Sequence, residues 1–311
     1  MSIPASLSTG LALPAIVSPM FLASGPDLVA AVCQAGLIGT FPALNQRTSE
    51  DYAAWLDDIR ARLDRAPGTS AAFGVNLIVN KRNARLAADL EVTVRHKVPL
   101  VITSMGAVRD VVDAVHAYGG VVFHDVVNAR HAEKAIEAGV DGIIAVCAGA
   151  GGHSGAQSPF ALVPEIRAMF SGTIVLAGAI STGSQIAAAR MIGADLAYMG
   201  TRFLATEEAM IEAAYKQMIL RAKARDILYT PAISGVNANF LVPSIRDNGL
   251  DPDALAGKTP ADLGQDVKAW RTVWSAGQGV GSVNDILPAV ELCQRLIREY
   301  EAAFEPLRRR A

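Results

Sequence analysis

The chain has 311 residues, of which 51% are hydrophobic and 19% are charged, a composition that supports a sizeable core and excludes a disordered chain. The formal net charge of −2 gives no sign of a nucleic-acid-binding surface, and charged residues interrupt every apolar run before membrane-spanning length. Three widely spaced cysteines without metal-ligand spacing and the absence of a signal-peptide pattern favour a cytoplasmic enzyme with no bound metal.

Eight short runs rich in Val, Ile and Ala are the predicted strands. In chain order they are residues 15–20, 38–44, 73–79, 100–104, 121–126, 142–147, 174–177 and 197–201. Continuous apolar runs of this length suit strands that are buried on both faces of a parallel sheet. Amphipathic segments such as 49–63 and 128–138 lie between them and are predicted helices, with Ser49 and Asn128 as N-caps.

The alternation of strand and helix predicts the overall fold. Eight repeats favour an α/β fold of the closed (β/α)8 TIM-barrel type over an open doubly wound sheet, and no GxGxxG follows the first strand. We therefore assign residues 1–221 to the barrel. Segment 222–281, rich in Pro, Gly and Asn, is predicted to be an irregular insertion that covers the active site. Segment 282–311 is predicted to be a final helix that packs back on the barrel.

The ends of the last two strands are candidates for a phosphate site. In a barrel of this type the active site lies at the carboxyl ends of the strands, and loops after strands seven and eight often bind phosphate. Gly178 with Ala179, and Gly200 with Thr201, occupy these two ends and offer backbone N–H groups and a hydroxyl. The alternative is that the glycines only allow the strands to turn into helices.

The segment 147–155, CAGAGGHSG, follows the sixth strand and carries the strongest catalytic candidate. Glycine allows the backbone to approach a ligand closely, and the near-neutral pKa of an imidazole suits His153 to general-base chemistry. His124 ends the fifth strand and either touches a ligand or is a satisfied structural group. Three roles are open for Asp125: to orient His124, to act at the site, or to cap the next helix. Asn76 suits the pyrimidine edge of a flavin, or satisfies neighbouring backbone groups.

Several segments, in this order along the chain, resemble a known family. They are residues 14–20, 73–77 (FGVNL), 150–155, 177–178, 199–205 (MGTRFLA) and 273–279 (VWSAGQG). Each is a weak motif, but the ordered set spans nearly the whole chain and is similar to that of the nitronate monooxygenases, formerly 2-nitropropane dioxygenases. These are FMN-dependent TIM-barrel enzymes.

The resemblance implies a cofactor, a base and a reaction. His153 corresponds to the catalytic base, which removes the α-proton of a nitroalkane. FMN and O2 then carry the oxidation of the nitronate to a carbonyl compound and nitrite. A homodimer is a further expectation. The residues expected at the FMN are Met20, Asn76, His124, Gly151, Gly152, Gly178, Ala179, Gly200, Thr201, Gln278 and Gly279.

Two departures from the family pattern concern the flavin and the substrate. Phe21-Leu22-Ala23 stand where the family often has glycines, and His124-Asp125 stand where many members have His-Lys. One alternative is therefore an NAD(P)H-dependent FMN reductase of the same superfamily, similar to the enoyl-ACP reductases or quinone reductases. A second is a flavin-free barrel such as a phosphosugar lyase or isomerase. That class needs a lysine or paired carboxylates at the strand ends, and only Asp125 is present there.

Overall fold

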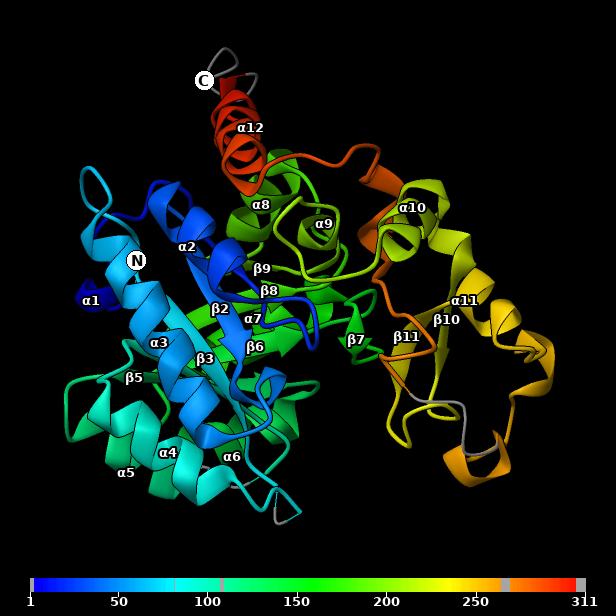
Figure 1. The fold of residues 1–311 in the computed structure, drawn as a ribbon, viewed down its shortest axis with the longest axis horizontal. Helices are drawn as coiled ribbons and strands as arrows, with labels where there is room; N and C mark the ends of the chain where they lie inside the picture. The colour runs from blue at the N-terminus through cyan, green and yellow to red at the C-terminus, as the bar shows by residue number, and fades with distance from the viewer. Residues whose placement is uncertain (1–2, 81, 107–108, 264–268, 306–311) are drawn as a thin grey trace.

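Eight parallel strands close into a barrel in the computed structural model, which describes residues 3–80, 82–106, 109–263 and 269–305 (Figure 1). The strands are β1 (Ala15–Val17), β2 (Ile38–Pro42), β3 (Phe73–Ile78), β4 (Leu100–Ser104), β5 (Val121–Val126), β6 (Gly142–Val146), β8 (Thr173–Ala177) and β9 (Leu196–Met199). Each pairs in parallel with the next, and β9 pairs with β1. The predicted (β/α)8 barrel is confirmed, with strand ends within three residues of those expected.

Helices cover the outside of the barrel between the strands. They are α2 (Pro26–Gln34), α3 (Ser49–Asp64), α4 (Leu86–Arg95), α5 (Arg109–His116), α6 (Ala129–Glu137), α7 (Pro159–Met169) and α8 (Gly183–Met191). The Asn128 side chain caps α6, as predicted, by accepting from the His131 N–H. The prediction of Ser49 as a cap was wrong by one residue. Thr48 caps α3 by accepting from the Asp51 N–H, and Ser49 donates instead to Asp89 Oδ1 at 2.6 Å.

Alternate residues of each barrel strand face two separate apolar layers. One layer fills the barrel interior and includes Ile102, Phe123 and Ile144. The other lies between the strands and the helices and includes Val101, Val122 and Ile143. Since side chains alternate along a strand, this parity decides which residue at each strand end faces the barrel axis.

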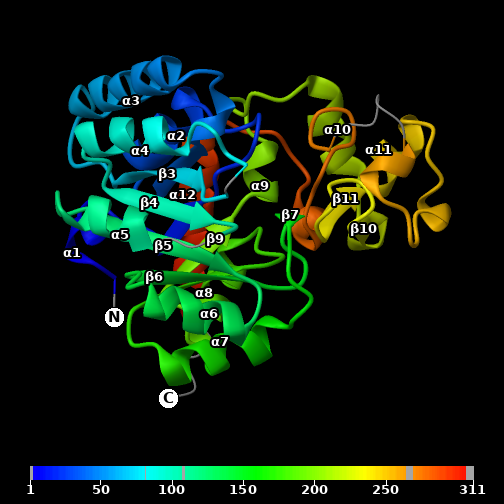
Figure 2. The same ribbon diagram turned by 90° about the horizontal axis from the view of Figure 1, so that it is seen from below.

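A small antiparallel sheet stands beside the barrel, in the order β10 (Ile227–Thr230), β11 (Ala238–Leu241) and β7 (Gly152–His153). Figures 1 and 2 show its lobe, with α10 (Ala213–Arg221) and α11 (Val242–Asp247), at one end of the barrel. The prediction of an irregular insertion was therefore wrong for these strands. The runs ILYT and ANFL are each only four residues long, too short to show a clear period.

Short elements complete the fold. They are α1 (Ala5–Ser8), α9 (Thr201–Leu204) and the 3₁₀ turns η1 (Ala43–Asn45), η2 (Ala224–Asp226), η3 (Pro252–Ala254), η4 (Pro260–Leu263) and η5 (Gln278–Ser282). The last helix, α12 (Ala289–Ala302), packs against α8 and α2, and residues 306–311 of the predicted final segment lie outside the described residues.

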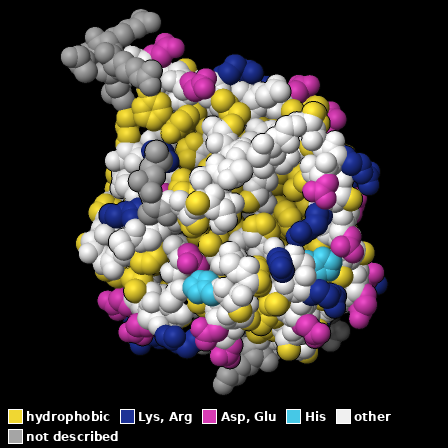
Figure 3. Space-filling model, turned by 90° about the vertical axis from the view of Figure 1, so that its left-hand side faces the viewer, with side chains coloured by type: hydrophobic (Ala, Val, Ile, Leu, Met, Phe, Trp, Pro, Cys, Tyr) yellow, Lys and Arg dark blue, Asp and Glu magenta, His cyan; other side chains and the backbone are white. Residues whose placement is uncertain are grey.

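The surface mixes charges of both signs. On the face in Figure 3, both Lys and Arg side chains and Asp and Glu side chains are present. Among the helices of the described residues, none combines the length and the apolar character that a membrane crossing requires.

Candidate functional site

A cavity of about 620 Å³ opens at the carboxyl ends of the barrel strands. Every barrel strand contributes to its wall at or next to its last residue, and segments 210–215 and 270–279 close it from the side of the lobe. The contributions from the strands include Ser18, Pro42, Asn76, Ser104, Asp125, Val146, Ala177 and Tyr198. The volume lies within the range of about 300–1,000 Å³ that is typical of pockets for cofactors and small molecules.

Strained backbone is concentrated around this cavity. Five residues other than glycine have a positive φ among the described residues, and four of them line the cavity: Leu22, Met105, Ala179 and Trp270. A side chain in this region of φ costs free energy, so such residues persist where packing and hydrogen bonds hold them, and they cluster at functional sites. The position of the strain supports the cavity as the functional site.

The loop that carries His153 is held by hydrogen bonds from the lobe. Asn239 Nδ2 donates to the Ala150 carbonyl at 2.7 Å, the Gly152 N–H donates to Ser275 Oγ at 2.9 Å, and the Gln278 N–H donates to the Gly149 carbonyl at 2.9 Å. The main chain of His153 is also paired with β11. The imidazole is therefore carried on an anchored short strand, and not on a free loop.

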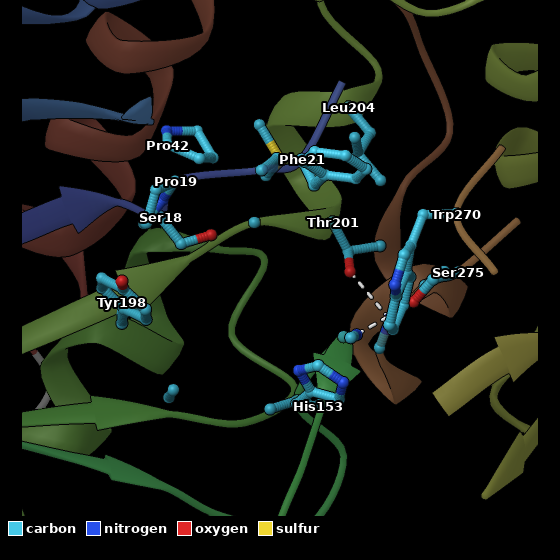
Figure 4. Close-up of a pocket in the computed structure, with 18 of the residues that line it drawn as sticks. Ser18, Pro19, Phe21, Pro42, His153, Tyr198, Thr201, Leu204, Trp270 and Ser275 are labelled. Atoms are coloured by element: carbon cyan, nitrogen blue, oxygen red, sulfur yellow. Dashed lines mark hydrogen bonds between the residues drawn. The ribbon is translucent and has the colours of Figure 1, made fainter. Parts of the chain in front are cut away.

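The His153 ring opens into the cavity beside Trp270. The two ring centroids are 5.3 Å apart and nearly perpendicular, and Figure 4 shows both rings on one side of the cavity. No hydrogen bond to a described residue engages the imidazole nitrogens. The side chain is exposed to the cavity, but the surrounding protein walls desolvate the cation, and this burial lowers the pKa of His153 from 6.5. Near neutral pH the ring is thus an uncharged base with a free nitrogen.

The ends of β8 and β9 form a shallow cradle. The N–H groups of Gly178 and Gly200 have no acceptor among the described residues, and both glycines line the cavity. Gly178 has φ +144°, a conformation that side chains rarely adopt, and Ala179 follows at φ +54°. Thr201 Oγ1 accepts from the Gly277 N–H at 2.8 Å, which leaves its own hydroxyl proton for another acceptor.

The returning segment 274–279 approaches the His153 loop so closely that it requires glycine. A Cβ atom at Gly277 would lie 2.5 Å from the Gly149 carbonyl oxygen and 2.8 Å from the Gly151 nitrogen. Gly279 lines the cavity and accepts at its carbonyl from Ser181 Oγ. Gln278 is exposed beside Gly149 and is not among the cavity-lining residues, so its predicted contact with a cofactor has no support in the geometry.

The turn after β1 is clamped by Asn45. Its Nδ2 donates to the carbonyls of Met20 and Ser24, and its Oδ1 accepts from the Leu22 N–H at 2.8 Å. The clamp holds Leu22 at its positive φ and directs Met20, Phe21 and Leu22 to the cavity.

Asn76 also lines the cavity. Its Nδ2 donates to the Ile102 carbonyl and to Ser104 Oγ, so its Oδ1 stays available as an acceptor.

His124 does not face the cavity. Its neighbours of the same parity on β5, Val122 and Val126, belong to the layer under the helices, and its Nδ1 is 2.8 Å from Thr103 Oγ1. Burial, the largest cause, and the nearby His131 on α6 lower the pKa of His124 to about 4, and the Thr103 contact opposes this shift in part. The predicted cofactor contact of His124 therefore has no support, because a shift of one residue moves a side chain to the other face of a strand. Of the two alternatives for His124, the structure agrees with a satisfied structural group.

Asp125 is the residue of β5 that faces the cavity, one inward position beyond Phe123. Oδ1 is shielded from solvent and has no hydrogen-bond partner among the described residues. Burial raises the pKa of this carboxyl from 3.8 to about 7. Asp125 departs from the family pattern in the sequence, and the parity of β5 directs it to the wall of the site.

Four aromatic residues of the wall, Tyr198, Tyr215, Trp270 and Trp274, were not predicted as site residues from the sequence. Tyr198 on β9 is half-buried and Tyr215 on α10 is buried, and desolvation by the surrounding protein raises the pKa of both phenols. Trp274 stacks on Tyr215 with centroids 4.7 Å apart, and the Tyr215 hydroxyl donates to the Ser275 carbonyl. Trp270 stacks on Phe240 at 5.0 Å. The inward parity of β9 indicates Tyr198, whereas Trp270 belongs to a lobe whose strands had no clear pattern.

Comparison with known proteins agrees with this geometry. The sequence profile of the family described as nitronate monooxygenase matches residues 83–299. A nitronate monooxygenase of Paraburkholderia phytofirmans is 29% identical over 96% of this chain and 95% of its own length. The solved structure of nitroalkane oxidase from Streptomyces ansochromogenes has a TM-score of 0.78 at 26% identity and covers 95% of this chain and 97% of that one. FabK from Thermotoga maritima has a TM-score of 0.81 at 26% identity, covering 97% and 96%.

The family match covers well over half of the chain, and the relatives align along nearly its whole length. The resemblance drawn from the ordered motifs is thereby confirmed. The chain belongs to the nitronate monooxygenase family and is an oxidoreductase.

Proposed function

We propose that the protein oxidises alkyl nitronates and nitroalkanes with FMN and O2, giving a carbonyl compound and nitrite, and that His153 is its general base. The observation that carries this proposal is the His153 imidazole. It is uncharged near neutral pH, free of hydrogen bonds to described residues, and open to the cavity. It lies in the same cavity as the cradle formed by Gly178, Gly200 and Thr201.

The cavity fits FMN by the chemistry of its walls. Unpaired N–H groups of Gly178 and Gly200 and the free hydroxyl proton of Thr201 suit a phosphate, which accepts hydrogen bonds. The free Oδ1 of Asn76 suits a ring N–H group. When bound there, FMN supplies the electron transfer between substrate and O2. The residues that would hold it are Met20, Asn76, Gly151, Gly152, Gly178, Ala179, Gly200, Thr201 and Gly279.

The protein's own part is to remove a proton and to bind the substrate. The α-proton of a neutral nitroalkane moves to the free nitrogen of His153, leaving the substrate as a nitronate anion beside the imidazolium that forms. Because burial lowers the pKa of His153 from 6.5, the base form predominates at neutral pH. Trp270 packs nearly perpendicular to the ring and would hold its orientation. A preformed nitronate needs no such step.

The mouth of the cavity is apolar and supports a substrate with an alkyl chain. Phe21 and Met210 are 46% and 47% exposed, and Leu22 and Met105 are similarly open. All four line the cavity, and Figure 4 shows Phe21 next to Leu204 at the end away from His153. An alkyl group that covers these side chains removes apolar surface from water on both partners, which favours binding.

A second candidate function is that of an NAD(P)H-dependent flavin reductase. The likeness to FabK over 97% of this chain supports this candidate. The two candidates share the barrel and the flavin, and they differ in the compound that delivers electrons.

Anaerobic titration of the FMN-loaded protein tests the proposed function. We expect the visible absorbance of the flavin to be lost on addition of an alkyl nitronate and to persist on addition of NADH or NADPH. Aerobic turnover should then release nitrite in proportion to O2 consumed. Rapid bleaching by NAD(P)H with no response to nitronate would establish the reductase instead. A colourless protein that takes up no FMN would exclude both candidates.

Replacing Trp270 by alanine is expected to lower kcat/KM for a neutral nitroalkane by about 2- to 10-fold and to leave FMN affinity unchanged. The edge-to-face contact with His153 is of a kind worth roughly 0.5–1.5 kcal/mol, and its loss frees the imidazole. Steady-state kinetics with nitroalkane and with preformed nitronate provide the measurement. Trp270→Phe keeps an aromatic edge and should recover most of the activity. A loss that is the same with both substrates would show that Trp270 acts on binding and does not position the base.

A further inference from the structure

Asp125 is an acidic side chain at the inner wall of the cavity with no partner of its own. It lines the cavity from the end of β5, and among the described residues neither a hydrogen bond nor an ion pair engages its carboxyl group. An ionised carboxylate without a partner is costly to bury, and such a group commonly keeps its proton. A protonated carboxyl is a hydrogen-bond donor, whereas an ionised one only accepts.

The groups around Asp125 do not supply a compensating positive charge. Tyr198 on β9 lies in the same wall, and burial first and the charge of Asp125 second raise the pKa of its phenol, which is thus neutral. On the adjacent strands the inward residues are Ile102, Ser104, Ile144 and Val146, none of them charged. The other titratable groups of the cavity wall are His153, Glu212, Tyr215 and Arg271, and none of these four forms an ion pair with Asp125.

We propose that Asp125 is protonated when the flavin is bound and donates a hydrogen bond to an acceptor on the flavin ring. The inference rests on the proposed cofactor. It gives this chain a neutral hydrogen-bond donor at Asp125, the position where many members of the family have a charged lysine. A burial-raised pKa of about 7 in the protein without cofactor agrees with it.

Asn76 provides the complementary half of this recognition. Its Oδ1 is a free acceptor, because Nδ2 is engaged by the Ile102 carbonyl and Ser104 Oγ. The pyrimidine edge of a flavin carries an N–H group between carbonyl oxygens, so it requires both an acceptor and a donor from the protein. Asn76 supplies the acceptor from β3 and protonated Asp125 supplies the donor from β5, and both line the same cavity.

The sign of the pH dependence separates a donor from an acceptor. If binding requires the proton on Asp125, FMN affinity is constant below the pKa of the free protein and falls as the pH rises above it. If the ionised carboxylate accepts from the flavin instead, affinity rises over the same interval. The second ionisation of a phosphate monoester lies near pH 6, so a range that begins at pH 7 largely avoids it.

The experiment is a titration of the full-length apoprotein with FMN, followed by quenching of flavin fluorescence between pH 7 and 9. We expect the Kd of the wild-type protein to rise by up to about tenfold per pH unit until the bound-state pKa is reached. Asp125→Asn keeps an N–H donor without a titratable proton and should give a Kd that does not vary with pH. Asp125→Ala should bind about 2- to 10-fold more weakly at pH 7 because it has lost the donor.

Each result decides for or against the donor role. A wild-type Kd that is constant or that falls with rising pH overturns the proposal. So does the same upward slope in folded Asp125→Asn. If that variant does not fold, the infrared carbonyl band of a protonated carboxyl in the wild-type protein decides: its loss as the pH rises through 7 supports the proposal, and its absence at pH 7 and below overturns it. Failure to bind FMN at any pH would instead reject the proposed cofactor.

Discussion

Replacing His153 by alanine is expected to lower kcat/KM for a neutral nitroalkane by roughly 10²–10⁴-fold while FMN remains bound, because that range is what a positioned general base contributes. Turnover of preformed nitronate should change far less, since the proton is already gone. Paired steady-state assays with the two substrate forms, together with flavin absorbance, provide the measurement. The substitution should leave the small sheet intact, because β7 pairs with β11 through its main chain and not through the imidazole.

The pH profile gives a second test of the same role. With wild-type protein, kcat/KM for the neutral nitroalkane should be constant near neutrality and fall as the pH drops through the pKa of His153, which burial places below 6.5. This acidic limb should be absent in His153→Ala. His131→Ala removes an exposed imidazole on α6, away from the cavity, and serves as the matched control. An equal loss with nitroalkane and nitronate would remove the general-base role.

The barrel could be predicted because its strands are buried on both faces. A strand of that kind is a continuous apolar run, such as Gly142–Val146, whose five residues are all buried. The helices between the strands show the complementary pattern of one apolar face. The rule that active sites lie at the carboxyl ends of barrel strands then indicated Asn76, Gly178, Gly200 and His153, and all four line the cavity.

Strand parity explains where site prediction was less accurate. An apolar run that is buried on both faces does not reveal which of two neighbouring residues points inward, since both environments are apolar. His124 and Asp125 illustrate the problem: one contacts Thr103 under the helices and the other lines the cavity. Only the register of β5 with β4 and β6 shows which of the two side chains points inward. When a family motif is matched by sequence position, the strand register must therefore be known before a side chain of the motif is assigned to a ligand.

The lobe was less predictable for a different reason. Its sheet joins β7, which follows β6, to a hairpin that begins more than seventy residues later at Ile227, so its central contacts are non-local. Trp270, which packs against His153, comes later in the chain than this hairpin. No short window of sequence contains these partners together. The Asn239 bond to Ala150 shows that such long-range contacts fix the position of the catalytic candidate.

Gly200→Val is expected to weaken FMN binding by about 5- to 150-fold, because filling a tightly packed site costs roughly 1–3 kcal/mol. A Cβ at this position would lie 2.7 Å from Ser18 Oγ and 3.7 Å from the Met20 side chain. The Ser18 hydroxyl can rotate away, but the two methyl groups of valine then extend into the cavity. With φ −111° the backbone accepts a side chain, so the effect comes from lost space and not from backbone strain.

FMN content of the purified protein and a titration of the apoprotein measure this effect. Gly200→Ala adds only the Cβ and should have an intermediate affinity. Gly281→Val is the matched control, because Gly281 is exposed and the nearest atom to its Cβ would be 3.7 Å away. The thermal unfolding midpoint of each variant separates loss of affinity from loss of fold. If folded Gly200→Val binds FMN as the wild-type protein does, the phosphate does not lie at Gly200. The cradle at the ends of β8 and β9 would then only shape the turns into α8 and α9.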